Sequence, residues 1–450
     1  MSDTSSKPPR TSLSDIMLAS AHNVQAVLSG RSLSEGLAAT PTELRAATQA
    51  VTFHVMRRLG LINQVKQLLV QRTPPNPLFD ALLLVSLALL DTATEVAADP
   101  DSGQATRRDL PVYAVHTVVD QAVEAVAGQH KMRSYKGLLN ATLRGFTRER
   151  DAILAQARKN PEGQWNHPDW WIWQLKRAYP DQWHQLLDAA NLPGPMTLRV
   201  NTRRATVEQV LSALAEADIQ AQAIGQAGVV LAGARPVHAV PGFTQGWWSV
   251  QDASAQQAAE LLQPRNGMRV LDACAAPGGK TAHLLELADI DLLALDTDKV
   301  RLDRVGENLN RLGLMGPKVS LQCADAANLK QWWDGQPFDA VLADVPCTAS
   351  GIVRRHPDIR WLRREADIAK TVALQRKIVN ALWETVKPGG RLVYATCSIF
   401  PQEGEQQAAR FLATHPDAKR LPAPGQILPL SDGGQASRYD GFFYALFAKE

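Results

Sequence analysis

The chain has 450 residues, of which 45% are hydrophobic and 21% are charged, and its formal net charge is +3. This length exceeds what one hydrophobic core supports, so we expect two or three domains of a soluble globular protein. Residues 1–10 are polar and predict a disordered tail without the apolar segment of a secretory signal. The longest apolar run, Ala81 to Leu90, is far shorter than the roughly 20 residues of a membrane helix.

The charge is unevenly spread along the chain. Residues 131–159 carry eight basic and two acidic side chains, and residues 354–377 carry eight basic and three acidic ones, so the rest of the chain is acidic. Two basic segments indicate an anionic polymer such as a nucleic acid, because phosphate contacts dominate nucleic-acid affinity. Two solvated helix faces explain the same counts equally well, and charge alone leaves both interpretations open.

Residues 11–155 predict a helical domain. Apolar side chains recur there at helical spacing in four segments, Val24 to Leu28, Val51 to Leu59, Leu78 to Leu90 and Val115 to Val126. A further helix over Leu138 to Phe146 leads into the first basic segment. No residue pattern in this domain indicates catalysis.

Residues 156–245 predict a smaller α+β domain. Short strands are expected at Met196 to Val200 and Gly228 to Leu231, with a helix near Val207 to Ala215 and a linker at Gly242 to Gly246. Five tryptophans crowd the start of the domain: Trp165, Trp170, Trp171, Trp173 and Trp183. We expect them to pack in a core or between domains, and a platform for stacking bases is the alternative.

Residues 246–450 alternate between strand and helix patterns. Strands are expected at Arg269 to Ala273, Leu292 to Leu295, Lys318 to Gln322, Phe338 to Ala343, Arg391 to Ala395 and Gly441 to Phe447. Because strands alternate with helices, the pattern predicts a doubly wound, mostly parallel α/β sheet.

The first of these strands leads into a loop of small residues that predicts a cofactor pocket. The loop and the start of the following helix comprise Cys274, Ala275, Ala276, Pro277, Gly278, Gly279 and Lys280. Small side chains let the backbone pass close to a ligand, and a helix N-terminus favours negative charge. Gly279 to Thr281 also resembles the end of a P-loop, but Cys274 stands where that motif needs glycine, which disfavours a nucleotide hydrolase.

Acidic residues follow the next three strands. Asp296 ends the second strand, where an acid commonly accepts hydrogen bonds from ribose hydroxyls. Asp325 follows the third strand, placed to receive an adenine amine, and Asp344 ends the fourth. A helix cap or a loop residue explains any one of them, whereas three acids in register indicate a cofactor that carries ribose and adenine.

Two cysteines lie just past the ends of expected strands. Cys347 follows the fourth strand in Asp344–Cys347, and Cys397 follows the fifth in Ala395–Ser398. If these strands are neighbours, about 4.8 Å apart, both thiols face one substrate group at the strand ends. The pair suggests covalent chemistry on an electrophilic ring. A helix expected near Gln402 would favour the Cys397 thiolate, and Lys280 is a candidate cation beside it.

The remaining cysteines, Cys274 and Cys323, are expected to act as small buried hydrophobes. The four cysteines form no CxxC pair and lie at no metal-ligand spacing from a histidine, so we expect neither a metal site nor a disulfide framework. A reducing cytoplasm is the default compartment for such a chain.

With these motifs the chain resembles the RNA cytosine-5 methyltransferases of the RsmB/NOP family. The resemblance rests on Leu271–Thr281, Asp344–Cys347 and Ala395–Ser398, and Gly351–Trp361 is most similar to the bacterial branch. It covers nearly the whole chain, is densest in residues 246–447 and is looser before about residue 150. The family commonly has Ala at Val345 and Ser at Thr348, which leaves the chemistry intact, and Tyr113 to His116 departs more.

The resemblance implies an all-α NusB-like RNA-binding domain, a small α+β domain and a Rossmann-like class I methyltransferase domain. It implies transfer of a methyl group from S-adenosylmethionine to carbon 5 of one cytosine in 16S ribosomal RNA. By the same resemblance, Cys397 is the attacking thiolate, Asp344 bonds the ring nitrogen and Cys347 serves the release step. The basic segment after Cys347, including Arg354 and Arg355, is placed to hold the RNA.

Other functions stay open beside this one. The chain could methylate another RNA such as a transfer RNA, or serve as a non-catalytic ribosome-assembly factor that keeps a methyltransferase-like scaffold. A methyltransferase acting on an amino nitrogen is disfavoured, because that chemistry needs no thiol nucleophile. Oligomeric state is not encoded in any motif, and a monomer is the default.

Overall fold

A computed structural model describes residues 11–72, 75–99, 110–430 and 437–450, and the predicted tail at residues 1–10 lies outside them. The chain divides into two compact units. The first runs to Asn191 and includes His356–Arg363, and the second contains Leu192–Arg355 and Arg364–Glu450. The predicted domain boundaries at residues 155 and 245 remain predictions.

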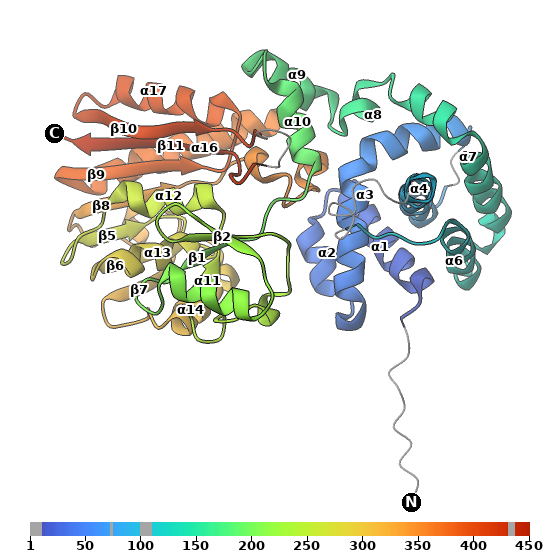
Figure 1. Cartoon of the computed structure of the whole chain (residues 1–450). Helices are drawn as coiled ribbons and strands as arrows, with labels where there is room; N and C mark the ends of the chain where they lie inside the picture. The colour runs from blue at the N-terminus through green and yellow to red at the C-terminus, as the bar shows by residue number, and fades with distance from the viewer. Residues whose placement is uncertain (1–10, 73–74, 100–109, 431–436) are drawn as a thin grey trace, which may run out of the picture. The chain divides into compact units, whose positions relative to one another are not determined.

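The first unit is helical, as expected. Its helices are α1 (Leu13–Leu28), α2 (Leu33–Ala39), α3 (Thr42–Leu69), α4 (Pro77–Ala98), α6 (Val115–Gly128), α7 (Lys136–Ala157), α8 (Pro161–Trp165), α9 (Asp169–Ala178), α10 (Trp183–Asn191) and α15 (Ile359–Leu362). Helix α4 lies at the centre of the large helices and contacts α1, α3, α6 and α7 (Figure 1). A cap sets its start, because Asn76 Oδ1 accepts the backbone N–H groups of Leu78 and Phe79 at 3.1 Å.

Helix α4 is apolar all round because neighbouring helices surround it. It is the one helix of the described chain that is long and apolar enough to cross a membrane by length and composition. However, 72% of its most apolar 18-residue window is buried. This burial is what a core helix shows, and it makes α4 the centre of the hydrophobic core of the unit.

The second unit contains a small antiparallel sheet at its start. Its strands are β1 (Thr197–Val200), β2 (Ala221–Ile224), β3 (Gly228–Leu231) and β4 (Trp248–Val250), in the order β2-β3-β1-β4, with helix α11 (Val207–Glu216) packed on it. The predicted strands at β1 and β3 and the predicted helix are confirmed. The sequence did not predict β2, which is half exposed, or the three-residue β4 that pairs with β1.

The large sheet has the predicted doubly wound, mostly parallel form. Its strands are β5 (Arg269–Asp272), β6 (Asp291–Asp296), β7 (Val319–Cys323), β8 (Phe338–Asp344), β9 (Val386–Thr396), β10 (Ala418–Ile427) and β11 (Phe442–Lys449). The strand order is β10-β11-β9-β8-β5-β6-β7, with β5 to β9 parallel and the last two strands antiparallel. Only β10 was not predicted.

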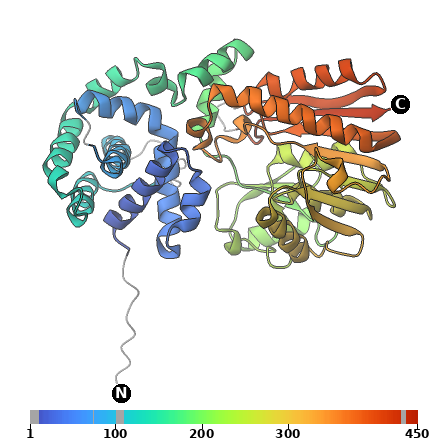
Figure 2. The same cartoon turned by 180° about the vertical axis from the view of Figure 1, so that it is seen from behind.

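Two layers of helices cover this sheet. Successive side chains along a strand point to opposite faces, so Val341 and Leu342 on β8 lie in different cores. Helices α12 (Ala253–Leu262), α13 (Gly279–Leu287) and α14 (Lys299–Leu312) pack on one face. Helices α16 (Glu365–Thr385) and α17 (Glu405–Thr414) pack on the other face, which Figure 2 shows from the front.

The strand order reverses at β5, which pairs with β6 on one side and β8 on the other. Open α/β sheets bind ligands outside the carboxyl ends of the strands at this reversal. The loops after β5, β6, β7, β8 and β9 therefore define the place to look for a functional site.

Candidate active site

The loop after β5 makes a tight turn into α13. Gly278 has φ +93°, and a Cβ there would come within 2.9 Å of Val305 Cγ1, so only glycine fits without strain or displacement. The backbone N–H of Ala276 donates to Asp296 Oδ2 at 3.1 Å, which joins this loop to the end of β6. The predicted loop of small residues is therefore present at the reversal of the sheet.

The predicted acids gather around this loop. The charges of Asp272, Asp296, Asp325 and Asp344 all act on the thiol of Cys274, whose pKa is raised well above its usual value by burial and by these carboxylates. Cys274 therefore stays a neutral thiol, as its predicted packing role requires. Cys323 is exposed, so the expectation that it is buried is wrong.

Two of the acids also make local turns. Asp296 Oδ1 accepts the backbone N–H of Asp298 at 2.9 Å, and Asp325 Oδ1 accepts that of Ala327 at 2.9 Å. These bonds are the loop-residue alternative that the sequence left open. Asp325 nevertheless keeps a side chain that is 42% exposed and can accept a further donor.

The residues at the strand ends fit S-adenosylmethionine. Asp272 is fully buried, its Oδ2 accepts the Thr281 hydroxyl at 2.7 Å, and its Oδ1 has no partner among the described residues. Burial raises the pKa of Asp272 to about 7. A glycine turn, an unpartnered buried carboxylate oxygen and acids after β6 and β7 are the groups that a ribose, an adenine and an amino group require.

The two cysteines meet, as expected. Strands β8 and β9 are parallel neighbours with Asp344 opposite Ala395, so Cys347 and Cys397 leave the sheet side by side. Their sulfur atoms are 3.3 Å apart and both thiols are free. The pKa of Cys347 is raised well above its usual value, first by the hydrogen bond with Cys397 and then by burial.

Lys280 and Asp344 form an ion pair beside the thiols. Nζ of Lys280 donates to Asp344 Oδ2 at 2.6 Å. Burial lowers the pKa of Lys280, but the charge and hydrogen bond of Asp344 and the neighbouring Cys397 outweigh it and raise the pKa. The predicted cation near Cys397 is therefore present and charged.

The helix expected near Gln402 does not begin there. A 3-10 turn occupies Pro401–Glu403, and α17 starts at Glu405. The expected helix is therefore present but starts three residues later, and its support for the Cys397 thiolate stays a prediction. The physical reason is that Tyr394 and Ser398 bind Glu403 and hold the preceding turn in another shape.

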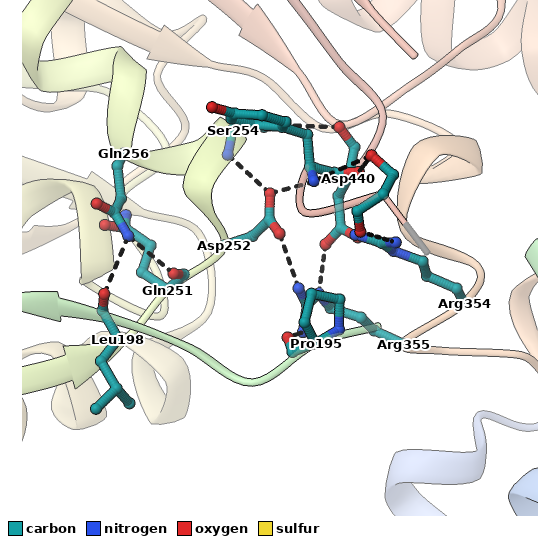
Figure 3. A network of polar contacts seen from close by, with 11 residues as sticks. Pro195, Leu198, Gln251, Asp252, Ser254, Gln256, Arg354, Arg355 and Asp440 are labelled. Atoms are coloured by element: carbon teal, nitrogen blue, oxygen red, sulfur yellow. Dashed lines mark hydrogen bonds and ion pairs between the residues drawn. The ribbon is translucent and has the colours of Figure 1, made fainter. Parts of the chain in front are cut away.

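The first two basic residues after Cys347, Arg354 and Arg355, are held in ion pairs (Figure 3). Arg354 is 2% exposed, and Asp440 receives Nε of both Arg354 and Arg355. Arg355 also donates to Asp252 Oδ2 at 2.7 Å and to the Pro195 carbonyl at 2.9 Å. Burial therefore contradicts the RNA role predicted for Arg354, whose guanidinium group is held by internal partners. The Arg355 side chain is 24% exposed, so its RNA role stays a prediction. No motif predicted Asp252 or Asp440 as partners, because they lie 103 and 85 residues from Arg355 along the chain.

Arg360, in the same basic segment, is not exposed to bind RNA, because it is fully buried in the helical unit. It donates to Asn191 Oδ1 and to the Ala190 carbonyl, both at 2.5 Å. Burial lowers the pKa of Arg360 to about 9. The exposed basic residues that remain in residues 354–377 are Arg364, Lys370, Arg376 and Lys377.

The tryptophans mostly pack, as expected. Trp171 is 1% exposed, and the rings of Trp165 and Trp183 meet edge to face at 4.9 Å. Trp173 differs, since it is 51% exposed with the Arg177 guanidinium 5.5 Å from its ring centroid.

The chain is similar to known proteins at the level of family models and of individual sequences. Residues 259–448 match the model described as 16S rRNA methyltransferase RsmB/F, and residues 167–238 match the ferredoxin-like domain of RsmF/B-like methyltransferases. A ribosomal RNA small subunit methyltransferase B from Vibrio cholerae is 41% identical over 440 residues, which cover 95% of each chain.

Solved structures agree with these matches. The crystal structure of PH0851 covers 99% of both chains with a TM-score of 0.73 at 26% identity. A methyltransferase homolog protein from Pyrococcus horikoshii covers 64% of this chain and 97% of its own, with a TM-score of 0.56 at 28% identity.

Proposed function

Because the chain belongs to the RsmB/F family of 16S rRNA methyltransferases, whose methyl donor is S-adenosylmethionine, we propose that it methylates carbon 5 of one cytosine in small-subunit ribosomal RNA. We propose further that a covalent bond between cysteine and cytosine forms during the reaction. The observation that carries this proposal is the pair of thiols, 3.3 Å apart at the ends of β8 and β9, beside Asp344.

The chemistry explains why two thiols and a carboxyl group are useful. Carbon 5 of cytosine is a weak nucleophile because the ring is aromatic. Addition of the Cys397 thiolate to carbon 6 pushes an electron pair towards the ring nitrogen. For Asp344 to favour this addition, its carboxyl group must carry a proton on the oxygen that does not accept from Lys280 and donate that proton to the ring nitrogen. Carbon 5 then has the electron density to take the methyl group that S-adenosylmethionine supplies.

The release step assigns a role to Cys347. Cys347 first loses its own proton to water, and its thiolate then takes the proton from carbon 5. The electron pair left on carbon 5 re-forms the ring double bond, and the bond between carbon 6 and Cys397 breaks to free the Cys397 thiolate. In the free enzyme the pKa of Cys347 is raised first by the hydrogen bond with Cys397, then by burial and by the charge of Cys397. The two effects of Cys397 disappear once its sulfur is bound to the cytosine, so the pKa of Cys347 falls and its thiolate forms more readily for the release step.

The cofactor pocket in this proposal is the loop from Cys274 to Lys280 with Asp296, Asp325 and Asp344. Each of these acids lies at the end of a neighbouring parallel strand or just past it. The fixed turn at Gly278 lets the backbone approach the methyl donor closely.

RNA is the proposed partner of the helical unit. Exposed basic residues on α7 and just before it support this, namely Lys131, Arg133, Lys136, Arg144 and Arg148. A NusB-like fold for this unit, a monomeric enzyme and a cytoplasmic location belong to the same proposal. The target base must leave its stack to reach the thiols.

Methyl transfer from labelled S-adenosylmethionine to unmodified small-subunit RNA tests the proposal, with the modified position mapped. Transfer to carbon 5 of one cytosine, lost in Cys397→Ala, would support it. In Cys347→Ala, RNA should stay bound to the protein on a denaturing gel, because release is blocked. Transfer to a transfer RNA instead, or RNA binding without any methylation, would favour another RNA substrate or the assembly-factor alternative.

A further inference from the structure

One buried carboxylate joins the two cysteine loops. Glu403 is fully buried, and its Oε1 accepts the backbone N–H of Thr348 at 2.9 Å. Its Oε2 accepts the hydroxyl of Ser398 at 2.7 Å and also the hydroxyl of Thr348. Thr348 directly follows Cys347 and Ser398 directly follows Cys397, so a single side chain fastens both loops.

A second layer holds the carboxylate itself. Gln375 Nε2, from α16, donates to Glu403 Oε1 at 3.0 Å and to the Pro346 carbonyl at 2.9 Å. Tyr394 on β9 donates its hydroxyl to the Glu403 carbonyl at 2.8 Å. The segment before Cys347 and the strand before Cys397 are thus tied to the same residue.

The donor set requires a carboxylate. Four donors converge on two oxygens, and the side-chain amide of glutamine offers only one acceptor oxygen and adds two donors. Among the described residues none of these donors is a lysine or an arginine, so the carboxylate is held by neutral groups. Burying an acid without a cation is costly, which favours a functional reason for this residue.

We propose that Glu403 is a positioning residue that fixes Cys347 and Cys397 relative to each other. This inference rests on the proposed function, in which the two thiols act in turn on one cytosine. A displacement of about 1 Å between them would place one sulfur out of reach of its carbon, and such displacements cost about 100-fold in rate.

An electrostatic effect points the same way. The titratable groups that face Cys347 among the described residues are Cys397, Glu403 and Tyr394. After the hydrogen bond with Cys397, burial and the charge of Cys397, the charge of Glu403 also raises the pKa of Cys347, while the backbone N–H of Ala349 lowers it. Glu403 therefore adds to the effects that keep Cys347 protonated in the free protein.

The first test compares Glu403→Gln with Asp417→Asn. Asp417 is a matched control, because it is a carboxylate of the same unit that accepts the Trp383 indole N–H at 3.1 Å. Trp383 lies on α16 more than two helical turns beyond Gln375, so this contact is separate from the Glu403 site. We expect Glu403→Gln to lower kcat about 100-fold with the Kd for S-adenosylmethionine within twofold of wild type, and Asp417→Asn to leave both unchanged. An unchanged kcat in a folded Glu403→Gln protein would overturn the inference.

The second test needs no RNA and no methyl transfer. Alkylation of Cys347 by iodoacetamide is followed across pH by peptide mass spectrometry of the full chain. Without the charge of Glu403, Cys347 should react at lower pH in Glu403→Gln than in wild type, and Asp417→Asn should match wild type. If the profile of Glu403→Gln shifts but the wild-type protein does not methylate cytosine, the proposed reaction is wrong and the effect of Glu403 on Cys347 remains. Identical pH profiles of Cys347 alkylation in wild type and Glu403→Gln would contradict the proposed effect of Glu403 on Cys347.

Ser398→Ala covers the case in which Glu403→Gln does not fold. It removes one of the four donors and leaves the carboxylate in place. We expect about a tenfold lower kcat with an unchanged Kd for S-adenosylmethionine, since one loop loses one of its fixings. A kcat equal to wild type in a folded Ser398→Ala protein would overturn the proposal.

Discussion

Lys280 and Asp344, 64 positions apart in the chain, share one ion pair of 2.6 Å between α13 and the end of β8. The same ammonium lies 5.2 Å from the ring centroid of Phe442, so it is held on two sides. An ammonium fixed beside a carboxylate and a thiol is already in place to stabilise negative charge that develops on either. This pair links the predicted cofactor loop to the strand that leads to Cys347.

Replacing Lys280 by methionine keeps the length of the side chain and removes its charge. We expect methyl transfer to fall by about 10²–10³-fold, the usual loss for one preorganised charge, with RNA affinity unchanged. Steady-state kinetics with the Kd for S-adenosylmethionine measured separately provides the check. Lys299→Met is the control, because Lys299 is exposed on α14. A loss confined to the Kd for S-adenosylmethionine would limit Lys280 to cofactor binding.

Asp440 is the shared partner of Arg354 and Arg355, and its removal should destabilise the fold. In Asp440→Asn both guanidinium groups lose a buried charge partner, which typically costs about 3–5 kcal/mol. The free energy of unfolding of the second unit, measured by urea titration, gives this cost. Asp334→Asn breaks a pair whose carboxylate is 49% exposed and should cost less than about 1 kcal/mol. Equal costs for the two variants would show that burial of the arginines adds nothing.

Much of the fold could be predicted because local pattern and tertiary environment agree. Strands β5, β6 and β8 are largely buried, so each is a short apolar run bounded by polar residues. Strand β10 breaks that rule, since it lies at the edge of the sheet, is only partly buried and contains Pro422 and Pro424. Because β10 has no apolar run, it is defined only by its pairing with β11.

Part of the site could also be predicted from the sequence, and part could not. Cys347, Cys397 and Asp344 stand at strand ends, so their meeting follows from the alternation of strands and helices once β8 and β9 are neighbours. The roles of Arg354 and Arg355 did not follow, because their partners come from distant segments and charge counts do not reveal burial. The proposed role of Glu403 could not be predicted for the same reason, because it depends on a contact with Thr348, 55 residues away along the chain.

Gly351 packs so closely against Gly441 that no side chain fits between them. A Cβ on Gly351 would lie 2.0 Å from the Gly441 carbonyl oxygen, and the two backbones are joined by a hydrogen bond of 2.9 Å. We expect Gly351→Ala to lower the free energy of unfolding by about 1–3 kcal/mol and to displace the loop after Cys347. Gly316→Ala, which meets nothing within 4 Å, is the control for thermal unfolding. A Gly351→Ala protein as stable as this control would mean that the loop yields without cost.

Asp272 should make stability depend on pH. Its pKa is raised from 3.8 to about 7, mainly by burial, so between these values the folded chain holds a proton that the unfolded chain has lost. The resulting stabilisation is complete below pH 3.8 and disappears as the pH rises through 7.

Wild type should therefore lose about 1.4 kcal/mol of unfolding free energy per pH unit relative to Asp272→Asn across this window. Urea unfolding of both proteins from pH 4.5 to 7.5 measures the difference, and Asp291→Asn, an exposed acid on β6, should run parallel to wild type. If the unfolding free energy of Asp272→Asn also changed with pH in parallel with wild type, Asp272 would be ionised throughout this range, with its unpartnered oxygen stabilised by another group.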